Sequence, residues 1–329
     1  MSEVPSTGTP AFKNRRPGLI GCGIVHLLFG LLFVGFALLM VITLVAAPPE
    51  AAAAMPAGMT VYTGLFYLAL ATLFATLGIG SMMARRWAPP LILVTSWGWL
   101  LCGVVGAGAI SFMMPQITAS LPNDQQAAKP VIAGCMSLGI GLFGIVLPLA
   151  FILFYRSTHV KATAEQLDPV PRWTDRQPIS LLIFASWMFF GAASVLLSSF
   201  MYKALPIGGF MLRGWPVFAV MAAMATLLFW IGVGTLRRLP SAWWSAVGML
   251  VIGVAWGALF TFSTDPLAMY EAMGMPANPE QEAITKAMYS SPLFYAWIAI
   301  VWIGYLVFLL YLRRYFFPQS KPHSERPAV

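Results

Sequence analysis

Few residues in this sequence could do chemistry in an apolar environment. His26 is the one Asp, Glu, Lys, Arg or His clearly inside an apolar run, and Cys22 lies four residues before it, on the same face of a helix. A histidine can bind a haem iron, and a histidine with a cysteine can begin a zinc or copper site. Both sites usually need further ligands, and His159 and His323 lie in polar segments. We expect His26 to be a hydrogen-bonded interior residue and keep it as the one cofactor candidate. No metal site and no cofactor are predicted.

Catalytic motifs are not evident in the chain. It contains neither a GxSxG nor an HExxH motif, and no pair of carboxylates falls within the apolar runs. Transport driven by protons or ions normally uses buried Asp, Glu or Arg residues. The sequence therefore argues against an enzyme and against an ion pathway, while passage of a neutral or hydrophobic small molecule stays open.

The composition indicates the solvent in which these residues must be positioned. Of the 329 residues, 59% are hydrophobic and 9% are charged, whereas about one quarter of an ordinary soluble domain is charged. The net charge of +8 comes from Lys and Arg residues beside the ends of apolar runs, with no nucleic-acid-binding motif. The fold class predicted is an all-α integral membrane protein whose first partner is the lipid bilayer, with no nucleic acid.

Apolar runs of about twenty residues are long enough to cross the hydrocarbon layer of a bilayer. The first run exceeds the roughly 7–15 residues of a signal-peptide core, so we expect it to stay as a helix. We predict eight transmembrane helices, near 19–46, 61–84, 90–113, 131–155, 179–202, 216–236, 241–263 and 292–312.

The positions of Lys and Arg predict the orientation. With the amino terminus in the cytoplasm, fifteen of them fall on the cytoplasmic side and four on the other. Two double arginines, Arg85-Arg86 and Arg237-Arg238, are the clearest topology signals. We therefore expect both tails, 1–18 and 318–329, to be cytoplasmic and disordered. Short loops with this bias are typical of a bacterial inner membrane.

An internal repeat divides the chain. Residues 69–81 align without gaps to 223–235, with six identities in thirteen positions, including one threonine and two glycines. The preceding spans also correspond at one constant offset, which places Trp187 at the position of His26. The remaining spans match weakly and are paired by their order. We predict two tandem four-helix repeats in parallel orientation, 19–156 and 179–317, joined by a polar cytoplasmic connector at 157–178.

Small and polar residues inside the spans suggest two roles. In lipid, stripes of small residues let helices approach closely, and we assign this packing role to Thr72, Thr76, Gly80, Gly253 and Gly257. Polar side chains could instead line a cavity between the repeats. The residues for that role are His26, Ser186, Ser194 and Ser198.

Three functions follow from these patterns. The leading hypothesis is a non-enzymatic scaffold or accessory subunit of a membrane assembly, with other membrane subunits or further copies of this chain as partners. The alternative is a transporter or channel for a neutral or hydrophobic small molecule, with its site near the midplane between the repeats. An enzyme or cofactor carrier based on His26 is the weakest of the three.

Overall fold

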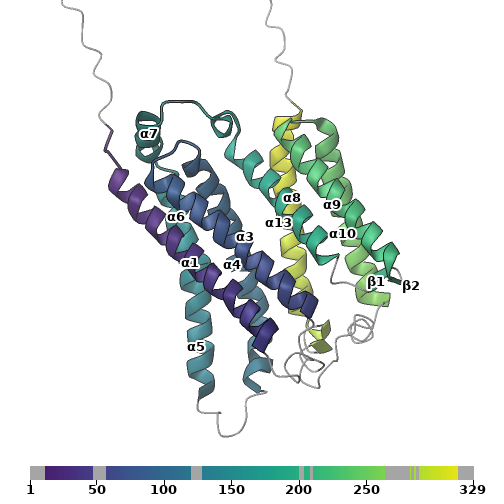
Figure 1. The fold of residues 1–329 in the computed structure, drawn as a ribbon. Coiled ribbons are helices and arrows are strands. Elements are labelled where there is room, and N and C mark those ends of the chain that lie inside the picture. The colour runs from purple at the N-terminus through teal and green to yellow at the C-terminus, as the bar shows by residue number, and fades with distance from the viewer. Residues whose placement is uncertain are drawn as a thin grey trace, which may run out of the picture. The chain divides into compact units, whose positions relative to one another are not determined.

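The computed structural model describes residues 12–46, 57–119, 128–199, 204–207, 210–263, 282, 285–286 and 289–317. Within them, eight helices are long and apolar enough to cross a membrane, which confirms the predicted all-α membrane fold (Figure 1). The spans are Arg16–Ala46, Gly58–Met82, Ala88–Ser111, Pro130–Tyr155, Ile179–Ser198, Trp215–Leu236, Pro240–Leu259 and Pro292–Phe316. The predicted tails fall mostly outside the described residues.

The chain forms two compact units. Unit 1 comprises residues 1–102 and 142–179, and unit 2 comprises 103–141 and 180–329. The connector at 157–178 belongs to unit 1 and contains the helix α7 (Thr158–Leu167) and a 3-10 turn, Trp173–Arg176. Polar residues of the chain thus form ordered structure within the first unit.

Unit 1 is built on a close pair of helices, α1 (Arg16–Ala46) and α3 (Ala57–Met82). A Cβ added to Gly23 would lie 2.7 Å from the carbonyl oxygen of Gly78, so glycines let the two main chains touch. The first part of α4 (Ala88–Ala119) and α6 (Leu147–Tyr155) complete the unit. Its core includes Leu19, Leu77, Ile92, Phe151 and Tyr155.

The fourth span is not a uniform α-helix. It consists of α5 (Lys129–Gly139), a π-helical segment at Ile140–Val146, and α6. Pro148 has no N–H with which to bond the carbonyl four residues earlier, inside this segment. The wider helical turns thus end two residues before a proline that interrupts the α-helical hydrogen-bond ladder.

Unit 2 contains α8 (Ile179–Ser198), α9 (Trp215–Leu236), α10 (Pro240–Ser263) and α13 (Pro292–Phe316), with Ser180 onward assigned to it. Its core includes Leu181, Phe184, Ile231, Trp243 and Leu309. The indole Nε1–H of Trp243 donates a 2.9 Å hydrogen bond to the carbonyl of Leu309, joining α10 to α13. An antiparallel pair, β1 (Ala204–Ile207) and β2 (Phe210–Arg213), precedes α9.

The turn after α3 and the turn after α9 have the same hydrogen-bond pattern. Ala84 and Arg238 both adopt positive φ, 49° and 57°, and the amide that follows each bonds the carbonyl of Gly80 or Gly234. These turn residues are separated by the same number of positions as the aligned segments 69–81 and 223–235. By geometry, Ala84 therefore corresponds to Arg238. The two double arginines do not correspond to each other in this alignment, because Arg85 falls opposite Leu239.

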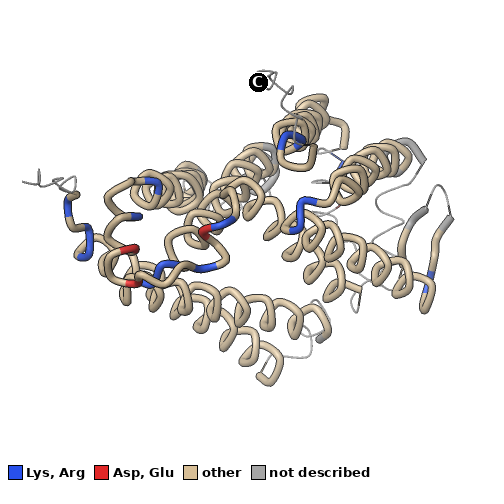
Figure 2. The backbone as a smooth tube through the Cα atoms, turned by 90° about the horizontal axis from the view of Figure 1, so that it is seen from above, with Lys and Arg blue, Asp and Glu red and all other residues tan. Residues whose placement is uncertain are grey.

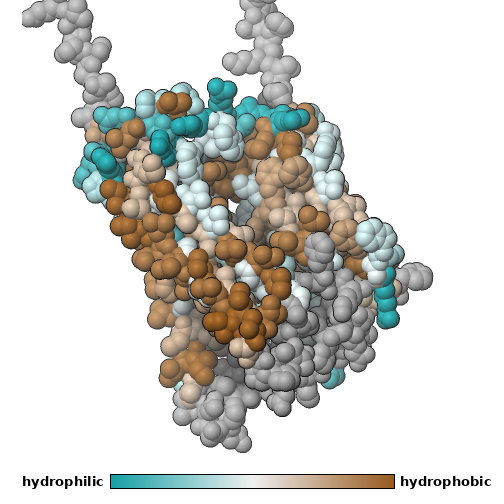
Figure 3. All heavy atoms as spheres, in the orientation of Figure 1, coloured by the Kyte–Doolittle hydropathy of each residue, from teal (hydrophilic) through white to brown (hydrophobic). Residues whose placement is uncertain are grey.

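Hydropathy differs along unit 1. Brown, apolar atoms cover α1, where Leu31 is 68% and Val45 is 82% exposed, whereas teal, hydrophilic atoms gather over α7 (Figure 3). An exposed apolar helix is stable in lipid and costly in water. This contrast fits a helix within the bilayer and a polar helix at its surface.

Candidate functional site

Arg86, in the turn between α3 and α4, is the centre of a charged cluster in unit 1. Its Nε lies 2.7 Å from Oδ2 of Asp175, and its Nη2 lies 3.4 Å from Oε1 of Glu165. The side chains of Arg86 and Asp175 are 18% and 21% exposed, so solvent screens this pair only in part. Red residues of α7 and the following turn lie among blue residues in Figure 2. Arg86 thereby ties the turn before α4 to the connector.

Asp168 forms the second contact between that turn and the connector. Its Oδ2 accepts a 3.2 Å hydrogen bond from the backbone N–H of Arg86, and the guanidinium of Arg172 lies 3.5 Å away. The backbone N–H of Arg86 lowers the pKa of Asp168 most, burial opposes this, and the charge of Arg172 lowers it further. Asp168 is therefore a buried, ionised carboxylate at neutral pH.

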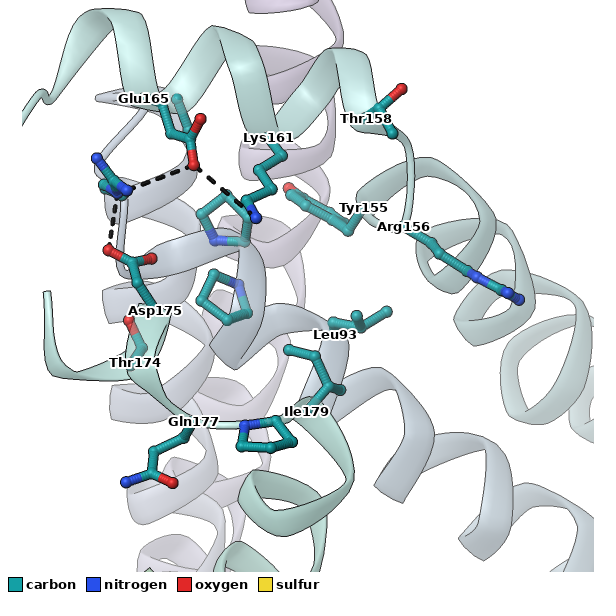
Figure 4. Close-up of a pocket in the computed structure, with 15 residues that line it drawn as sticks. Leu93, Tyr155, Arg156, Thr158, Lys161, Glu165, Thr174, Asp175, Gln177 and Ile179 are labelled. Atoms are coloured by element: carbon teal, nitrogen blue, oxygen red, sulfur yellow. Dashed lines mark hydrogen bonds and ion pairs between the residues drawn. The ribbon is translucent and has the colours of Figure 1, made fainter. Parts of the chain in front are cut away.

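A half-open cavity of about 350 Å³ lies beside this cluster (Figure 4). Its polar lining includes Arg86, Lys161, Glu165 and Asp175. In Figure 4, dashed lines join Glu165 to Lys161 and to the guanidinium that also contacts Asp175. Its apolar lining comes from the start of α4 and the start of α8: Pro89, Pro90, Leu93, Pro178 and Ile179. The cavity thus combines charged groups with an apolar wall at one end of the spans.

Buried hydrogen bonds fix the floor of this end of unit 1. The hydroxyls of Ser81 and Tyr155 are 2.6 Å apart, and Ser81 Oγ donates to the carbonyl of Leu19 at 2.8 Å. Three helices, α1, α3 and α6, are joined through these groups. Tyr155 also lines the cavity, so its wall is rigidly placed against the helix ends.

His26 lies in a different place, inside an aromatic cluster of unit 1. It is 1% exposed, and its Nδ1 lies 2.8 Å from the carbonyl of Cys22. The rings of Phe151 and Phe74 lie 4.5 and 5.7 Å from the imidazole centroid. In the part of the chain that the structure describes, no three His, Cys, Asp or Glu residues gather as a metal site would need. The geometry is that of a packed interior residue.

The other predicted cavity residues belong to unit 2. Ser186, Ser194 and Ser198 are half-buried on α8, and Ser198 Oγ donates to the carbonyl of Val195 at 2.9 Å. His26 and these serines are therefore described in separate units. Trp187 is partly buried against the unit 2 core, while its neighbour Met188 is buried.

The predicted packing residues occupy several environments. Thr72 and Thr76 are exposed on α3, and Thr72 Oγ1 donates to the carbonyl of Leu68. Gly80 is buried, with Trp87 and Ala88 against it, and Gly253 packs on the ring of Trp302. A Cβ at Gly257 would meet nothing within 4 Å. Among the topology arginines, Arg85, Arg237 and Arg238 are exposed and Arg86 is half-buried.

Sequence reasoning missed the partners of Arg86, because they lie about eighty residues further along the chain. One signal was available. The connector carries Glu165, Asp168 and Asp175 on the side that is otherwise strongly basic. Acidic residues among so many cations predict ion pairs, although they do not identify which arginine is bound.

Comparisons with known proteins give no assignment for this arrangement: no family model, curated protein or solved structure matches the chain.

Proposed function

We propose that this multi-pass membrane protein is a non-enzymatic scaffold or accessory subunit that assembles with other membrane chains. The observation that carries the proposal is an unoccupied face of α1. On its other face, α1 packs against α3 through Leu19, Gly23, His26 and Gly30, all buried. The outward face has the same kind of spacing, with no protein segment on it among the described residues.

The outward face follows a seven-residue repeat. Apolar or small residues recur at alternate steps of three and four, as in helices that pack side by side with a left-handed twist. All eight positions are exposed, and a Cβ at either glycine would meet nothing within 4 Å. The residues are Gly21, Ile24, Leu28, Leu31, Gly35, Leu38, Ile42 and Val45.

Hydroxyl groups of the spans support a packing role over a chemical one. Several donate to the carbonyl four residues earlier in their own helix, which satisfies the hydroxyl without a ligand. These residues are Thr43, Thr63, Thr72, Thr95, Ser111 and Thr226. A helix with satisfied polar groups and an open apolar face that includes two glycines is suited to contact another helix.

The orientation and the duplication are part of the proposal. The bias of Lys and Arg supports cytoplasmic termini and a bacterial inner membrane. The shared turn at Ala84 and Arg238 supports descent of the two halves from one four-helix unit. The parallel orientation of the repeats follows from an even number of spans in each.

The test is the number of copies of this chain in each particle that it forms in its own lipid. Replacing Gly21 and Gly35 together by leucine should reduce higher-order species about tenfold, measured by single-molecule photobleaching in native nanodiscs. Gly304→Leu is the matched control, because a Cβ at Gly304 also meets nothing within 4 Å but lies on α13. A wild-type chain that is always a lone monomer with lipid would overturn the proposal and favour the solute pathway.

A further inference from the structure

We propose that the cavity beside Arg86 binds the phosphate headgroup of an anionic phospholipid. The cavity lies where spans end and the polar connector begins, so a headgroup can reach it from the bilayer without leaving the interface. Its volume of about 350 Å³ accommodates a phosphate with its glycerol. This inference does not depend on the proposed assembly function.

The charge around the cavity selects an anion. The described residues at this end of unit 1 include nine Lys and Arg residues and three carboxylates. The carboxylates are already engaged: Asp175 and Glu165 with Arg86, and Asp168 with Arg172. The cations are Lys13, Arg15, Arg16, Arg85, Arg86, Arg156, Lys161, Arg172 and Arg176. Basic clusters beside spans attract anionic lipids.

Two exposed cations of the lining can turn towards a phosphate. Lys161 is 76% exposed, and among the described residues its ammonium pairs with Glu165 at 4.0 Å, so it can turn towards a stronger anion. Arg156, directly after α6, is exposed and lines the cavity; in Figure 4 its guanidinium points away from the other labelled residues, so this flexible side chain turns inward to reach a bound phosphate. Neither residue has to break the Arg86 cluster in order to bind.

Hydroxyl groups and the apolar wall complete the fit to a lipid. Thr174 is 2% exposed, lines the cavity, and its Oγ1 has no hydrogen-bond partner among the described residues. A buried hydroxyl without a partner is costly, and a phosphate oxygen would accept its hydrogen bond. Leu93 and Ile179 line the same cavity with hydrocarbon, which suits the glycerol and the first part of an acyl chain. A soluble phosphate would leave that wall without contact.

The experiment measures retained lipid on the full chain. The protein is reconstituted in nanodiscs of mixed phosphatidylcholine and phosphatidylglycerol, extracted in a delipidating detergent, and analysed by native mass spectrometry. We expect bound phosphatidylglycerol on the wild type and at least a tenfold loss when Arg156 and Lys161 are both changed to glutamine. Lys13→Gln with Arg85→Gln is the matched control, because it removes two cations from the same end that do not line the cavity. Glu165→Gln should increase retention, since it removes a negative charge from the lining.

Each other outcome contradicts the proposal. Equal loss in both double variants would show a general electrostatic attraction with no site. Displacement of the lipid by millimolar inorganic phosphate would identify a soluble phosphate compound as the ligand. Failure to retain phosphatidylglycerol on the wild type would exclude the site altogether. Thermal unfolding in neutral-lipid nanodiscs, unchanged between the variants, separates lost binding from lost folding.

Discussion

The aligned segments share a glycine, Gly78 in unit 1 and Gly232 in unit 2, and the contacts at this glycine differ between the units. In unit 1 a Cβ added to Gly78 would lie 2.8 Å from the carbonyl oxygen of Gly23, so two main chains meet there. In unit 2 a Cβ added to Gly232 would meet the ring of Phe189 at 2.7 Å. A ring can rotate away and a main chain cannot. The shared glycine therefore shows that similar sequences can give a rigid contact in one unit and an adaptable one in the other.

The two units also differ in the partners of an arginine at the end of a helix. Unit 1 anchors Arg86 with carboxylates from the connector. Unit 2 places the guanidinium of Arg313 about 6 Å from the rings of Trp243 and Phe317, at 6.0 and 5.9 Å. Ion pairs respond to pH and salt, whereas cation–π contacts of arginine do so weakly. The first unit is thus the one with an environment-sensitive end.

The largest expected effect tests the glycine contact. Gly78→Ala should reduce the free energy of unfolding by about 3 kcal/mol, because the new methyl group meets main-chain atoms of α1. Gly232→Ala should reduce the free energy of unfolding by about 1 kcal/mol, because the ring of Phe189 can move. The measurement is unfolding in mixed micelles at increasing dodecyl sulfate. Equal losses would mean that the two contacts are alike in stiffness.

The next effect tests the Arg86 cluster. Arg86→Met should cost about 2 kcal/mol, because it leaves Asp175 and Glu165 without their guanidinium partner in a partly buried place. Protease cleavage of the connector should rise in parallel. Arg85→Met is the control, since Arg85 is exposed and a surface change costs about 0.5 kcal/mol or less. Identical behaviour of the two variants would reduce Arg86 to a topology signal.

A smaller effect tests the aromatic end of unit 2. Trp243→Phe keeps a ring near Arg313 but removes the indole N–H that bonds Leu309, so we expect a loss of about 1 kcal/mol. The adjacent Trp244 is 61% exposed, and Trp244→Phe should change stability little. Unfolding curves of both variants, recorded side by side, decide whether the buried hydrogen bond matters.

The smallest effect separates the units by pH. The pKa of Asp168 is lowered from its usual value of 3.8, so its contribution to stability is complete above that value and is lost as the pH falls through the folded-state pKa. Acid should therefore loosen α7 before the end of α13, as followed by fluorescent labels on each. Asp168→Asn should abolish this difference, and its persistence in that variant would point to another carboxylate.

The sequence was sufficient for the spans and insufficient for the site. A helix can span the bilayer if it is long and apolar enough, and both properties can be seen in the sequence. The number and order of the eight spans therefore follow from composition along the chain. Arg86 could be recognised only as one of many cations, because Glu165 and Asp175 are too distant in sequence for any spacing rule. The β1–β2 pair was missed, although Gly208-Gly209 between two apolar runs is a hairpin signal. The helix α7 was also missed, because its polar composition gave no apolar run to predict it.

The π-helical segment at Ile140–Val146 has a consequence for how the fourth span must be mapped. In a π-helix each N–H bonds the carbonyl five residues earlier instead of four. The side chains that follow the segment are therefore rotated about the helix axis relative to those of a continuous α-helix. A single helical wheel drawn from Pro130 to Tyr155 would therefore assign lipid-facing and protein-facing positions wrongly on one side. A scanning substitution series along this span should show a periodicity that slips between Gly139 and Leu147, and only two separate wheels will describe it.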